Sequence, residues 1–141
     1  MRWLGWTILV IVLLVLWDVA WWLGFGVQDM SPWTLRQMVA QHNAPLIIDV
    51  RTAAEYRSFH IPGAVNVPWP ATLAELAVVS PDPDNPVVVV GLTGHRSAPA
   101  ARQLTQGGYT AVTNVPWGMV AWKLLGGEVV AGDAPGPLPG G

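Results

Sequence analysis

An unbroken apolar segment near the N-terminus, residues 3–25, constrains the folding of this 141-residue chain more than any other feature. Asp18 is its one ionisable residue. As a helix rising 1.5 Å per residue the segment is about 35 Å long, which is enough to cross a hydrocarbon core of about 30 Å. We expect a transmembrane helix here, and the remaining residues are enough for one domain of about 100 residues.

Tryptophans mark both ends of this segment. Trp3 and Trp6 stand at one end, and Trp17, Trp21 and Trp22 stand at the other. Aromatic belts at the two interfaces are typical of membrane-spanning helices. A cleaved signal peptide is the alternative, but the run is longer than a signal-peptide core and no small-x-small cleavage motif follows it. The segment therefore indicates an uncleaved, single-pass anchor in a lipid bilayer.

Asp18 has three possible roles within this anchor. It can be an interfacial carboxylate among the distal tryptophans, it can contact another transmembrane helix, or it can belong to a proton relay. For the second role we take Asp18, Trp17, Trp21 and Trp22 as candidate contacts with other membrane-protein subunits.

Charge favours one orientation and excludes one class of partner. Arg2 precedes the segment, whereas Arg36 is the first positive charge after it. The positive-inside rule therefore favours a soluble domain on the external, periplasmic side. The absence of cysteine fits either compartment. The net charge is −2 and there is no basic run, so we expect no nucleic-acid partner.

Short apolar runs and helical segments alternate through the rest of the chain. We expect strands at 46–50, 65–67, 87–90 and 111–115, and helices at 32–42, 53–59, 71–79, 97–106 and 117–125. This alternation predicts an α/β domain over residues 31–130, with a small parallel sheet flanked by helices on both faces. The Pro- and Gly-rich residues 131–141 are expected to form a flexible tail.

The segment that follows the four valines at 87–90 carries the candidate site. A strand, a short glycine-bearing loop and a helix start bring loop and first-turn N–H groups together, and such groups bind anions. The candidate anion-binding loop comprises Gly91, Leu92, Thr93, Gly94, His95, Arg96 and Ser97.

Three blocks of sequence resemble rhodanese-like domains. The first is Ile48-Asp49-Val50-Arg51, followed by Glu55-Tyr56 and by His60 to Pro68. The second is the loop, where Gly94, Arg96 and Ser97 match the family's Cys-x-x-Gly-x-Arg-Ser pattern. The third runs from Gly107 through Trp122. The resemblance covers residues 31–130 and implies the rhodanese-like fold.

The resemblance also identifies what the loop lacks. In the family the first loop position is the cysteine that carries a persulfide, and here it is Gly91, in a chain without any cysteine. Because sulfur transfer by this mechanism needs a thiolate, we expect no catalytic residue and no enzyme activity of this kind. No cofactor or metal ligand set is expected.

Other matched positions are assigned supporting roles. Arg96 either holds an anion, as the resemblance implies, or pairs with an acidic side chain. Asp49 and Arg51 are supporting residues: Asp49 is expected to be scaffolding at the strand end, and Arg51 to form a structural salt bridge or to pair with Glu55 or with the loop. His95 is expected to face solvent, and Ser97 to cap the following helix.

Three functions remain open at this point. The first is a membrane-anchored, catalytically inactive module that serves as an accessory or interaction subunit of a membrane complex. The second is a domain that binds or senses thiosulfate, sulfite or phosphate through its 91–97 loop. The third is a working sulfurtransferase.

Overall fold

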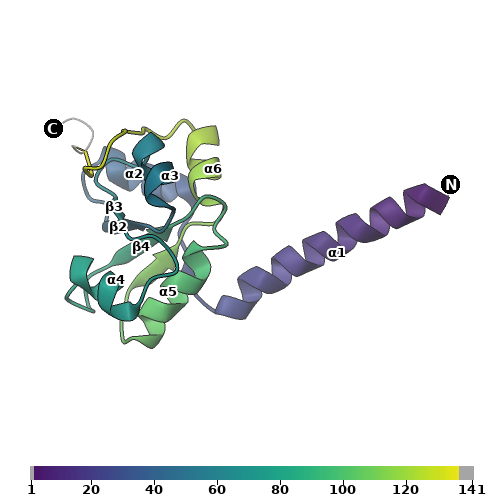
Figure 1. Cartoon of the computed structure of the whole chain (residues 1–141), viewed down its shortest axis with the longest axis horizontal. Coiled ribbons are helices and arrows are strands. Elements are labelled where there is room, and N and C mark those ends of the chain that lie inside the picture. The colour runs from purple at the N-terminus through teal and green to yellow at the C-terminus, as the bar shows by residue number, and fades with distance from the viewer. Residues whose placement is uncertain (1, 137–141) are drawn as a thin grey trace.

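The computed structural model describes residues 2–136, with the side chains of Arg2 and Trp22 excepted. Helix α1 (Arg2–Phe25) extends away from a compact α/β domain (Figure 1). None of its apolar window, Trp3–Phe25, is buried. The predicted helix is therefore present, with the length and composition that a membrane span requires. A signal sequence near the N-terminus meets the same requirement.

The domain is built on a parallel sheet. Within the described residues its strand order is β1-β5-β4-β2-β3, and every neighbouring pair is parallel. The strands are β1 (Gln28–Asp29), β2 (Leu46–Asp49), β3 (Val65–Asn66), β4 (Val87–Val90) and β5 (Val112–Asn114). The predicted fold class is confirmed. Edge strand β1 was not predicted, because two polar residues carry no strand periodicity.

Helices cover both faces of this sheet (Figure 1). They are α2 (Pro32–Ala40), α3 (Ala53–Ser58), α4 (Leu73–Val79), α5 (Ser97–Gln106) and α6 (Gly118–Leu124). The valines of β4 alternate between two cores: Val88 and Val90 belong to the core that includes Trp122, whereas Val87 and Val89 belong to the core that includes Leu104. This two-sided burial explains why β4 is apolar at every position.

Capping residues set two of the helix starts, as the sequence predicts. Ser31 Oγ accepts a hydrogen bond from Thr34 N at 3.0 Å, and Pro32 occupies the first turn of α2. Thr52 and Glu55 form a reciprocal capping box at the start of α3. The short α3 therefore begins immediately after the end of β2, and this places Glu55 beside the loop that follows β4.

The residues after α6 return to the domain. Val130 and His60 exchange backbone hydrogen bonds of 2.8 and 2.9 Å, and Gly63 N donates to Pro135 O at 2.7 Å. Gly132 N donates to the carbonyl of Arg57 at 2.9 Å. The first part of the segment that we expected to be a flexible tail thus packs on α3 and the following turn. Residues 137–141 lie outside the described residues.

Candidate functional site

The Gly91–Ser97 loop joins β4 to α5 at the carboxyl edge of the sheet, where parallel α/β sheets place their sites. The start of α6 holds this loop. Met119 N donates to Gly91 O at 2.9 Å, and Val120 N donates to Leu92 O at 3.1 Å. Gly118 has φ +40°, and a Cβ there would overlap the Gly91 carbonyl. Only glycine permits this close approach, a role that the sequence alone did not reveal.

Gly91 itself is not required by the backbone. A Cβ at this position would lie 3.4 Å from both Ser97 N and Ser97 Oγ, and 3.6 Å from Ser97 Cβ. These are ordinary van der Waals separations. The site therefore has room for a side chain at position 91, beside the first turn of α5.

The loop amides are the groups best suited to hold an anion. The backbone N–H groups of Leu92, Thr93, Gly94, Arg96 and Ser97 donate no hydrogen bond to any residue that the structure describes. Five available donors in a loop that opens a ten-residue helix are chemically suited to an anion.

The Arg96 guanidinium is paired with a carboxylate. Its Nη1 and Nη2 donate to the two carboxylate oxygens of Glu55 at 2.9 and 2.8 Å. The Arg96 guanidinium lowers the pKa of the Glu55 carboxyl to about 2, and the Glu55 carboxylate raises the pKa of Arg96. Of the two roles predicted for Arg96, the structure places it in the pair with an acidic side chain.

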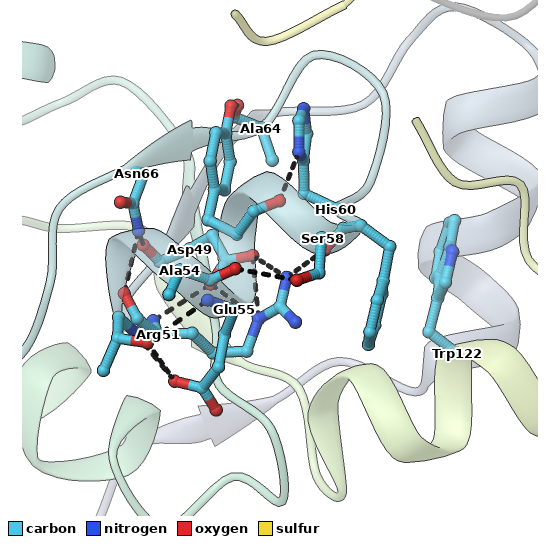
Figure 2. A network of polar contacts seen from close by, with 12 residues as sticks. Asp49, Arg51, Ala54, Glu55, Ser58, His60, Ala64, Asn66 and Trp122 are labelled. Atoms are coloured by element: carbon cyan, nitrogen blue, oxygen red, sulfur yellow. Dashed lines mark hydrogen bonds and ion pairs between the residues drawn. The ribbon is translucent and has the colours of Figure 1, made fainter. Parts of the chain in front are cut away.

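Asp49 and Arg51 form a buried pair (Figure 2). Arg51 Nε and Nη2 donate to the Asp49 carboxylate at 3.0 and 2.7 Å, and Nη2 also donates to Phe59 O at 2.6 Å. The exposed fractions of the two side chains are 1% and 0%. Asp49 is therefore scaffolding, as expected. The structural salt bridge expected of Arg51 is present, but its partner is neither Glu55 nor the loop, because the carboxylate two residues before it is nearer and binds the guanidinium.

Ser97 also differs from its expected role. It is the first residue of α5 and is fully buried, and its hydroxyl donates to Gly94 O at 3.1 Å. The preceding position, Arg96, makes no side-chain capping bond. The prediction that Ser97 caps the helix is therefore wrong, and its hydroxyl instead closes the loop on itself.

His95 connects the loop to α1, contrary to the expectation that it faces solvent. Its Nε2 lies 3.0 Å from Asp18 Oδ1, and its Nδ1 lies 2.9 Å from Thr93 Oγ1. The Trp21 ring lies 5.7 Å from the imidazole, centroid to centroid. A residue 77 positions away in the sequence thus supplies a polar partner for Asp18 within the same chain.

The other residues singled out in α1 lie close to this contact. Trp17 and Trp21 have ring centroids 6.5 Å apart. Arg102 of α5 donates to Gly24 O at 2.6 Å and so fixes the end of α1 against the domain. The side chain of Trp22 lies outside the described part of the chain.

A parallel sheet covered on both faces by helices, with a glycine-bearing loop between β4 and α5, defines this protein as a small α/β domain. A sequence model of the rhodanese-like domain matches residues 31–125, and the chain belongs to this family. Gly91 stands where the family has its cysteine, and no cysteine occurs elsewhere in the sequence.

Similar proteins agree with this assignment. A sulfurtransferase of Allochromatium vinosum is 32% identical over 105 residues, which cover 74% of this chain and 96% of the relative. The solution structure of a rhodanese-like domain from Anabaena sp. superposes with a TM-score of 0.65 at 25% identity, covering 74% of this chain and 80% of that one. A thiosulfate sulfurtransferase from Pseudomonas aeruginosa shares the fold, with a TM-score of 0.67 at 23% identity over 75% of this chain and 20% of that one.

Proposed function

We propose that this chain is a membrane-anchored rhodanese-like module that does not transfer sulfur and that acts as an accessory or interaction subunit of a membrane protein complex. The observation that carries the proposal is the combination of glycine at position 91 with a sequence that contains no cysteine. The proposal separates this chain from relatives that are named sulfurtransferases.

The chemistry of sulfur transfer supports this separation. A thiolate attacks a sulfane sulfur and stores it as a persulfide, and Gly91 has no side chain to do so. The loop hydroxyls are poor substitutes, since an alcohol is far less acidic than a thiol. Thr93 Oγ1 is also hydrogen-bonded to His95, and Ser97 Oγ is hydrogen-bonded to Gly94 O. Thiosulfate:cyanide transfer by the purified chain would overturn this part of the proposal and favour a sulfurtransferase.

The accessory role is supported by α1. Its apolar side chains are exposed along the helix, so they need lipid or other transmembrane helices around them. The retained sheet, helices and loop leave a folded domain beside that anchor, and such a domain can dock another protein without performing chemistry.

Solubilisation of native membranes in mild detergent tests this function. We expect the chain to elute well above its 15.1 kDa mass together with integral membrane subunits in fixed stoichiometry. A variant that lacks residues 3–25 is the control, and it should lose those subunits while keeping the folded domain. Elution of the intact chain as a detergent-bound monomer would count against an accessory role.

A second candidate function, anion binding, is favoured by the five loop amides that donate to no described residue. Calorimetry of the full chain in detergent with thiosulfate, sulfite and phosphate tests it. Since Arg96 pairs with Glu55, we expect Arg96→Ala to weaken binding only modestly, and the exposed Arg57→Ala to have no effect. The absence of binding at millimolar anion would reject this function.

A further inference from the structure

An exposed apolar stripe continues from the loop along α6. It consists of Trp117, Val120 and Leu124, which are 48%, 39% and 82% exposed. Val120 and Leu124 are four residues apart and so lie on one side of α6, and Trp117 is the N-cap residue just before the helix. Two large apolar side chains on α6 and a third on the residue that precedes it form a surface that favours an apolar partner.

This α6 stripe is connected to the anchor through the loop. The ring of Trp117 meets the His95 imidazole edge-on, with 6.2 Å between the ring centroids. The same imidazole also contacts α1, since it lies near the Trp21 ring and is hydrogen-bonded to Asp18. In Figure 1, α5 and α6 lie along the side of the domain toward which α1 extends. A bilayer crossed by α1 would therefore lie on the side of the domain that carries α6.

The position of Asp18 sets how closely the domain approaches that bilayer. Crossing about 30 Å at 1.5 Å per residue takes about 20 residues, or roughly residues 3–22 of α1. Asp18 then lies about 6 Å inside the hydrocarbon boundary. His95, with a ring nitrogen 3.0 Å from the Asp18 carboxylate, is held close to the same depth, and the Gly91–Ser97 loop therefore lies beside the boundary.

We propose that the α6 stripe is a membrane-docking surface whose partner is the lipid bilayer that α1 crosses. The stripe enters the headgroup layer and holds the Gly91–Ser97 loop against that layer. The domain then rests on the membrane surface and does not move independently of the bilayer. The Asp18–His95 contact fixes the domain in this orientation. This inference rests on the proposed anchoring by α1.

The cysteine-free sequence allows a direct test by single-site spin labelling of the full chain. Nitroxides are attached to Val120→Cys and to Leu124→Cys in lipid nanodiscs, and collision with oxygen, which concentrates in lipid, is compared with collision with a water-soluble nickel chelate. Val78→Cys is the matched reference, because Val78 is 80% exposed on α4, away from the stripe. Leu14→Cys reports on α1 itself.

Lipid docking predicts an oxygen-to-nickel collision ratio several-fold higher at positions 120 and 124 than at 78, and it predicts that Asp18→Asn lowers this ratio toward the reference value. A ratio equal to that at 78, with Leu14→Cys still in lipid, overturns docking and leaves the anchor intact. Low collision rates with both reagents at 120 and 124 mean that protein covers the stripe, and this also overturns lipid docking. Nickel access at Leu14→Cys overturns the anchor and the docking together.

Discussion

The substitution Gly91→Cys places a thiol in the loop and tests whether the loop stabilises negative charge. The substitution is sterically mild, because the new Cβ would lie 3.4 Å from Ser97 N and Oγ without overlap. Replacing glycine also reduces the entropy of the unfolded chain. We therefore expect the free energy of unfolding to change by less than about 1 kcal/mol.

The loop should acidify this thiol. An unperturbed cysteine has a pKa of about 8.5, and cysteines at helix N-termini or beside cations fall to about 3.5–7.5. The new thiol would have the start of α5 and the free loop amides beside it, whereas Arg96 is already neutralised by Glu55. We expect a pKa of about 7, near the upper end of that range. A shift of 1.5 units corresponds to about 2 kcal/mol in favour of the thiolate.

The rate of alkylation by iodoacetamide, followed against pH in the full chain, measures this pKa. Val78→Cys on the exposed face of α4 serves as the control and should titrate near 8.5. If the thiol at position 91 titrates together with that control in a folded protein, the loop does not stabilise negative charge. The anion-site reasoning, including the anion-binding candidate function, would then be refuted.

Three further substitutions test the scaffold, each measured by urea unfolding of the full chain in detergent. Gly118→Ala should cost about 3 kcal/mol, because its Cβ would overlap the loop carbonyl at φ +40°. Glu55→Gln should cost roughly 1 kcal/mol at pH 7, since the pair with its arginine is partly screened. The pKa of Glu55 is lowered from 4.5 to about 2, so this difference should disappear as pH falls through that window. Glu75→Gln is the control for the capping box: hydrogen bonds from Thr72 also lower the pKa of Glu75, but no arginine contributes, so its pH-dependent cost should be smaller. Asp49→Asn should cost about 3 kcal/mol by leaving a buried guanidinium unpaired, whereas Asp133→Asn in an exposed pair should cost nothing measurable.

The sheet and helices could be predicted because local patterns determine them. Four valines buried on both faces, capping residues before α2 and α3, and two glycines after α5 are each readable within a few residues. Edge strand β1 escaped prediction because its two polar residues are ordered by pairing with β5, a contact between segments about 85 residues apart.

The partners of the site residues could not be predicted in the same way. The family pattern fixes which residue types stand in the loop, but the bond between Arg96 and Glu55 depends on how α3 packs against that loop. The contact between His95 and Asp18 is even harder to predict from the sequence, because it joins the loop to a helix whose sequence resembles that of an independent anchor. Side-chain pairing across elements is a property of the packed structure and leaves no periodic signal along the chain.

The conformation of the Gly91–Ser97 loop does not depend on a side chain at position 91, because other groups hold it. Gly91 is held through its carbonyl by Met119 N, and the rest of the loop is closed by the Ser97 hydroxyl and tied to α1 by His95. The loop conformation therefore does not depend on a thiol at position 91. Because the loop is also bonded to Asp18 of α1, we expect a ligand or subunit that reorders the loop to shift α1 as well.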